Sequence, residues 1–81
     1  MKKIILRNPF VTKYDKAVGR CFIDTAKTLA EAADICIQDG DNVNASKFMA
    51  RSAEHWGLAA KHLGFRNIMD MNAYFMRHGK F

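Results

Sequence analysis

Apolar residues recur every three or four positions through most of the chain, the spacing of helices that bury one side. In the first such stretch they fall along one side of a helix at Tyr14, Val18, Cys21, Phe22, Leu29, Ala33, Cys36 and Ile37. The sequence "TKYD" places a hydroxyl at Thr12 and a carboxylate at Asp15, as in a capping box. Gly40 in "QDGDN" suits a left-handed helix end. These signals predict a helix over about 12–38, which could bend at Gly19 because an interior glycine costs about 1 kcal/mol.

A second periodic stretch predicts a helix over about 43–63, with Gly64 as its C-terminal cap. Its expected buried stripe is Ala45, Phe48, Met49, Ser52, Trp56, Ala59, Ala60 and Leu63. A third, shorter helix over about 67–78 begins at "NIMD", where Asn67 and Asp70 repeat the capping pattern. The side chains expected to fold back on the first two helices are Ile68, Met71, Tyr74, Phe75 and Met76.

The predicted fold is therefore all-α: an antiparallel helical hairpin closed on one side by a shorter third helix. An arm over 1–11 precedes it, either extended or as a short strand that would need a partner strand, and we expect the extended form. Residues 1–81 form a single domain in this prediction, because a chain of this length has room for one modest core.

Charge divides the chain into three parts. Residues 1–20 carry a net charge of +5, residues 21–43 carry −4 and residues 44–81 carry +4. The acidic second half of the first helix would lie beside the basic second helix, which favours an antiparallel hairpin. No apolar run approaches the roughly 20 residues that span a bilayer, and the run in "MKKIILRNPF" is too short for a secretory signal. We therefore expect a cytoplasmic protein.

The two cysteines, Cys21 and Cys36, lie fifteen positions apart in one predicted helix. That separation corresponds to a rise of roughly 22 Å, whereas a disulfide needs Cα atoms within about 7 Å. We expect both to be buried free thiols.

A row of small residues runs beside the main stripe of the second helix. Its members are Ser46, Ala50, Ala53, Gly57, Ala60 and Gly64. Small side chains let another backbone approach closely, and Gly57 in particular needs compensation for its cost inside a helix. The neighbour could be the first or third helix, or it could be a partner protein that contacts Ala50 and Gly57.

Another row of the second helix carries Arg51, His55 and His62. It is open to three interpretations: a solvated face, a contact with a phosphate or acidic partner, and a metal or catalytic site. The two histidines lie about 10 Å apart along a helix, too far to share one tetrahedral metal.

The stretch that begins "DGDNVN" does not match a calcium-binding EF-hand loop. Such a loop needs a glycine at its sixth position and a glutamate at its twelfth, and this chain has Asn44 and Ala50 there. The chain also has no phosphate-binding glycine loop, Cys-x-x-Cys pair or serine elbow, so we expect no enzyme, metal or cofactor.

The stretch "AKTLAEAADICIQDGDNVNASKFMARSAEHWGLAAKHLG", residues 26–64, resembles the opening hairpin of HEPN domains, and it is similarly close to one tetratricopeptide unit. The positions that match the latter are Leu29, Ala33, Gly40 and Ala45. Both resemblances imply a helical hairpin.

HEPN nucleases carry an Arg followed four to six residues later by His on a later helix. Here Arg51 and His55 lie on the second helix and Arg77 and His78 are adjacent, so the nuclease chemistry does not carry over. A tetratricopeptide array would need repeats that this chain lacks.

These observations predict a small non-enzymatic protein that docks on another protein as an adaptor or inhibitor, and that also forms a homodimer. The candidate contact residues are Arg51, His55, His62, Ala50, Gly57, Trp56, Phe65, Met69, Met76 and Phe81. The alternative is a nucleic-acid-binding protein whose affinity falls steeply with salt. Its contacts would come from the basic N-terminal segment, at Lys2, Lys3, Arg7, Lys13, Lys16 and Arg20.

Overall fold

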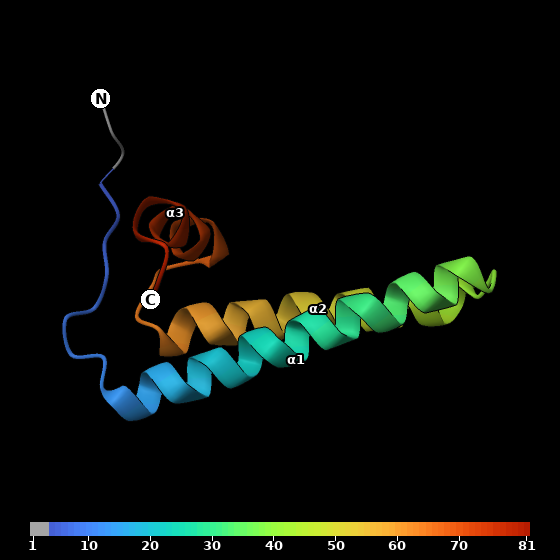
Figure 1. Ribbon diagram of the computed structural model, residues 1–81, viewed down its shortest axis with the longest axis horizontal. Coiled ribbons are helices and arrows are strands. Elements are labelled where there is room, and N and C mark those ends of the chain that lie inside the picture. The colour runs from blue at the N-terminus through green and yellow to red at the C-terminus, as the bar shows by residue number, and fades with distance from the viewer. Residues whose placement is uncertain (1–3) are drawn as a thin grey trace.

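The computed structural model describes residues 4–81, and this part of the chain contains three helices (Figure 1). They are α1 (Lys13–Gln38), α2 (Asn42–His62) and α3 (Ile68–His78). α1 and α2 lie side by side and antiparallel, whereas α3 is seen end-on above one end of this hairpin. We call that end, which also holds the arm, the base, and we call the turn at residues 39–41 the tip. The tip projects well beyond α3. The all-α prediction is confirmed.

The helix ends follow the local signals in the sequence. Thr12 Oγ1 accepts a hydrogen bond from Asp15 N at 3.1 Å, and Thr12 N donates to Asp15 Oδ2 at 3.2 Å, which completes the capping box. The Asn67 side chain caps α3 by accepting from Asp70 N, but the Asp70 carboxylate accepts from Arg66 and does not complete a capping box. Gly40 and Gly64 adopt the left-handed conformation just after α1 and α2, with φ of 79° and 87°. The predicted boundaries hold to within one residue.

Small residues form the contact between α1 and α2. The buried ones are Gly19, Ala26 and Ala33 on α1, and Ala45, Ser52, Ala59 and Ala60 on α2. Ser52 Oγ donates to Ala26 O at 2.7 Å, which shows how closely the two backbones approach. A Cβ atom at Gly19 would lie 2.6 Å from Leu63 Cγ. The bend that Gly19 could have allowed does not occur: α1 is continuous there, and the glycine makes room for a core leucine.

The buried side of α1 differs from the side that its apolar residues predicted. Tyr14 is 76% exposed, Ile37 is 55% exposed, and Cys21 also faces solvent. Cys36 is half-buried, so the expectation of two buried thiols is wrong for Cys21. The physical reason is that α2 packs on the neighbouring row of Gly and Ala, where close approach is available. On α2 the predicted stripe is largely confirmed, although Met49 is half-exposed.

The core lies at the base, where α3 meets the hairpin. Its buried members are Ile23, Ala59, Ala60, Leu63, Phe65 and Met71. Ile68 and Tyr74 of α3 pack against this cluster as expected. Met76 does not pack against the cluster and is 86% exposed, contrary to expectation. Phe75 is also partly exposed.

The arm is extended and is held by its own chain. Arg7 forms an isolated antiparallel bridge with Phe65, and Asn8 N donates to Gly64 O at 2.8 Å. Arg7 Nε donates to Leu63 O at 3.0 Å, and the guanidinium lies 4.8 Å from the ring centroids of both Phe65 and Tyr74. The strand-like partner for the arm is thus the α2–α3 connection. Lys2 and Lys3 lie outside the described residues.

Candidate functional site

One side of α1 is uncharged along nearly the whole helix. Its residues are spaced alternately by four and three positions and are Tyr14, Val18, Cys21, Thr25, Thr28, Ala32 and Ile35. We call this row the seam. A spacing of 3.5 keeps side chains in one line along a helix and is the spacing of coiled-coil contacts. Five of the seven are exposed, and Val18 and Ala32 are half-buried.

One of the two threonines of the seam, Thr28, is less polar than its type suggests. Thr28 Oγ1 donates to Asp24 O at 3.0 Å, so its hydroxyl is satisfied within the helix. Ile35 at the end of the row is 59% exposed. The seam therefore presents an uncharged and partly apolar surface to solvent.

The row Arg51, His55 and His62, which we call the histidine strip, lies beside the seam. Both histidine rings contact Phe22, with centroids 5.9 Å away for His55 and 5.3 Å away for His62, and the His62 ring is stacked on it. Phe22 follows Cys21 on α1 and joins the strip to the seam. We call this continuous surface of seam, Phe22 and histidine strip the docking face.

The hydrogen bond of His55 stays within α2. His55 Nδ1 lies 2.7 Å from Arg51 O, the main-chain carbonyl one turn earlier on α2. Its bond holds the ring against the helix and does not aim it at a reacting group. Among residues 4–81, no three or more His, Cys, Asp or Glu side chains gather closely enough to hold a metal ion.

α3 leaves the seam uncovered, because it packs against α2 and lies toward a different side of α1. Phe75 and Phe81 line a groove of about 280 Å³ together with Arg20, Ile23 and Asp24. These three α1 residues lie outside the seam. The seam is consequently left uncovered by α3 along the length of α1.

The structure separates the other predicted contact residues from the histidine strip. Met69 and Met76 are exposed on α3, whereas Phe65 is buried in the core and Phe81 packs on Phe65 and Phe75. Trp56 is half-buried against the core.

Ala50 and Gly57 are exposed on α2, and no atom lies within 4 Å of a Cβ built at Gly57. The expectation of a close neighbour for Gly57 within the chain is therefore wrong.

Sequence reasoning missed the seam as a surface, because Tyr14, Val18 and Cys21 belong to the apolar row that the sequence places on one side of the first helix. The signal was nevertheless present: seven uncharged residues at alternating spacings of four and three, beside a side of α1 rich in charge.

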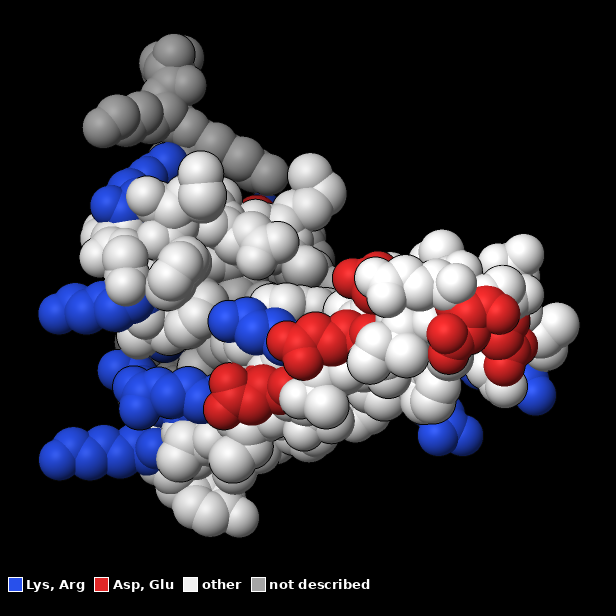
Figure 2. All heavy atoms as spheres, turned by 45° about the vertical axis from the view of Figure 1, so that its right-hand side comes forward, with Lys and Arg blue, Asp and Glu red and all other residues white. Residues whose placement is uncertain are grey.

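A second surface is the base, where Lys and Arg side chains gather while Asp and Glu side chains dominate toward the tip (Figure 2). The basic residues in this half of the molecule are Arg7, Lys13, Lys16, Arg20, Lys61, Arg66, Arg77 and Lys80. Four of them belong to the predicted N-terminal set, and the fold adds four from the C-terminal third of the chain. Arg7, Lys61 and Arg66 line an open cavity of about 410 Å³ beside the arm.

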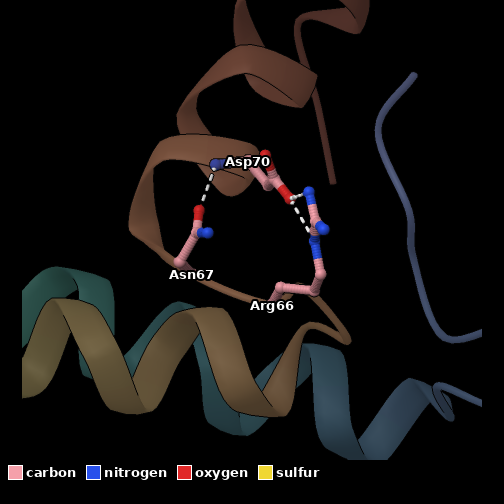
Figure 3. Close-up of polar contacts among 3 residues, drawn as sticks. All are labelled: Arg66, Asn67 and Asp70. Atoms are coloured by element: carbon pink, nitrogen blue, oxygen red, sulfur yellow. Dashed lines mark hydrogen bonds and ion pairs between the residues drawn. The ribbon is translucent and has the colours of Figure 1, made fainter. Parts of the chain in front are cut away.

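Arg66 contributes less charge to this cavity than its type suggests. Its Nε and Nη2 both donate to Asp70 Oδ2 at 2.9 Å, next to the bond between Asp70 N and Asn67 (Figure 3). Asp70 is 1% exposed, so this ion pair fixes the entry into α3. Arg7 is also engaged, by Leu63 O and the rings of Phe65 and Tyr74, so Lys61 is the exposed lining cation with no ion pair among the described residues.

Comparison of the chain with models of protein families, with curated proteins and with solved structures found no match. Among the described residues, no helix is both long enough and apolar enough to cross a membrane.

Proposed function

We propose that this protein is a small non-enzymatic binding module that docks on a helical surface of another protein, as an adaptor or inhibitor. The observation that supports this most is the exposed seam. A helix side that meets only water usually carries charged residues, as the opposite side of α1 does at Arg20, Lys27 and Glu31. A partner helix with its own uncharged row fits the 3.5-residue spacing.

The proposal is tested by site-specific photo-crosslinking in cells of the source organism. A photoreactive residue replaces Thr25 in the seam, and the matched control replaces Lys27, which is exposed two positions away on another side of α1. We expect covalent protein adducts from position 25 and few from position 27. Equal labelling at the two positions, or none at position 25, would contradict docking through the seam.

Nucleic-acid binding is a second candidate function, and one observation favours it. The base collects basic side chains from the arm, α1, the end of α2 and the chain beyond it, and a surface of this kind attracts phosphates. This surface is separate from the seam, so the two activities do not exclude each other.

A further inference from the structure

We infer that the groove between α1 and α3 holds an unpaired nucleobase of a single-stranded nucleic acid, while cations beside the groove contact the neighbouring phosphates. This inference rests on the second candidate function, nucleic-acid binding at the base of the hairpin, and names the form of nucleic acid that is bound. The groove has a volume of about 280 Å³, close to the lower end of the range for ligand pockets.

Two phenylalanines form one wall of the groove. Phe75 belongs to α3 and is 46% exposed, so part of its ring is open to solvent. Phe81 lies beside it, with the ring centroids 5.1 Å apart and the ring planes inclined by 32°. Phe81 also contacts the buried ring of Phe65, which ties this wall to the core. A nucleobase stacks on accessible aromatic rings of this kind.

Cations lie beside these rings. Arg20 and Lys80 line the same groove, and both are exposed. Lys13 and Lys16 precede Arg20 at spacings of three and four residues, so the three share one side of α1. This row runs about 10 Å from the groove toward the start of α1, on a different side from the seam. A strand with one nucleobase in the groove therefore has cations for its phosphates along α1.

One carboxylate, that of Asp24, also lines the groove, where Arg20 and Lys80 outnumber it. A carboxylate repels phosphate but accepts a hydrogen bond from an amino group at the edge of a nucleobase, as it does from N4 of cytosine. Thymine presents a carbonyl acceptor at the corresponding position. Asp24 therefore favours a nucleobase over a phosphate inside the groove, and cytosine over thymine.

A double helix does not use the groove in this way. Its nucleobases are stacked on one another, whereas an unpaired nucleobase can leave its neighbours and stack on a protein ring. We therefore expect single strands to enter the groove and duplexes to contact only the cations of the base.

Substitution of Phe75 tests the stacking. The variant is Phe75→Leu, which keeps an apolar side chain, and the matched control is Phe48→Leu, at a half-buried phenylalanine nearer the tip. Fluorescence anisotropy measures the affinity for oligodeoxycytidine and for a mixed-sequence duplex. We expect Phe75→Leu to weaken binding of the single strand about tenfold and to leave duplex binding unchanged. The control should change neither affinity.

Circular dichroism confirms that each variant is helical. An unchanged affinity of Phe75→Leu for the single strand overturns the inference, and so do equal losses for the single strand and the duplex.

Salt dependence separates the ring from the cations. Arg20→Gln should reduce the slope of log affinity for the single strand against log salt concentration by about 0.7, because one phosphate contact is lost. Phe75→Leu should leave the slope unchanged, because stacking releases no counterions. An altered slope in the Phe75 variant, or an unaltered slope in the Arg20 variant, overturns these assignments.

Nucleobase preference tests the carboxylate. We expect the protein to bind oligodeoxycytidine more tightly than oligothymidine, and Asp24→Asn to reduce that preference, because an amide can donate to thymine as well as accept from cytosine. A preference that Asp24→Asn leaves unchanged contradicts the role of Asp24.

The failure of this inference can be told apart from that of the candidate function. Binding of both nucleic acids without an effect of Phe75→Leu removes the groove and keeps nucleic-acid binding at the base. Undetectable binding of the wild type to either nucleic acid at low salt removes both. Phosphatidylserine vesicles are the remaining arm: binding to them that depends on Phe75, without binding to the single strand, overturns the inference in favour of a lipid surface.

Discussion

Gly19 and Gly57 are interior glycines of two adjacent helices with opposite surroundings. Gly19 is buried against Leu63, which is itself fully buried and has no room to move. Gly57 faces open space on α2. The first glycine is therefore required by packing, whereas the second only lowers the helix propensity of α2.

The same substitution at the two positions should have effects of opposite sign. Gly57→Ala should stabilise the protein by about 0.5–1 kcal/mol, because alanine favours the helix. Gly19→Ala gains the same propensity but overlaps Leu63, and we expect a net loss of about 1–2 kcal/mol. Thermal unfolding at low protein concentration measures both, with about 4–8 °C per kcal/mol for a domain of this size. A stabilising Gly19→Ala would show that Leu63 is not tightly packed.

The start of α2 depends on a charged cap at the tip. Asp41 accepts hydrogen bonds from the Asn44 side chain at 2.6 Å and from the Asn44 backbone N at 3.2 Å. The first of these, followed by the second, lowers the pKa of Asp41 below its usual value of 3.8. The folded state thus prefers the ionised carboxylate.

The cap therefore stabilises the fold fully above pH 3.8, the usual pKa of the carboxyl group. Its contribution is lost as the pH falls from 3.8 through the lower pKa that Asp41 has in the folded protein. Asp41→Asn keeps an acceptor oxygen but removes the titration, so its melting temperature should fall less than that of the wild type between pH 6 and pH 2.5. Asp39→Asn removes an equal charge from the same turn and is the control, which should retain the wild-type loss. Identical pH dependence of the Asp41 variant and the wild type would contradict a role for the ionised cap.

Helix ends could be predicted from the sequence because their determinants are local. Thr12 with Asp15, Asn67 with Asp70, and the glycines at 40 and 64 each act within a few residues. The buried side of α1 could not, because an apolar pattern gives little weight to Gly19 and Ala26, whose small size is what lets α2 approach. Because α2 packs on the side of α1 that holds Gly19 and Ala26, the seam is left exposed and Phe22 lies against the histidine strip.

At the scale of the whole molecule, charge is segregated from base to tip. If the base binds nucleic acid, log affinity should fall linearly with log salt concentration, with a slope of about −0.9 per phosphate contact on duplex DNA. Lys13→Glu with Lys61→Glu should abolish most of the binding, because both side chains are exposed at the base. The pair Lys27→Glu and Lys47→Glu makes the same charge change nearer the tip and should have a small effect.

Fluorescence anisotropy with mixed-sequence DNA and RNA at two salt concentrations measures this binding. Undetectable binding at low salt would end the nucleic-acid candidate, and equal losses in the two double variants would show that net charge, and not the base, is responsible.

The contact between Arg7 and Leu63 joins residues 56 positions apart. Arg7 Nη2 is buried without a hydrogen-bond partner, so the two aromatic rings around the guanidinium compensate for its lost hydration. The hairpin can form from segments that are neighbours in the sequence. The contact between Arg7 and Leu63 can form only when most of the chain is available. During synthesis on the ribosome, the arm must therefore wait for the α2–α3 connection to emerge before it can dock.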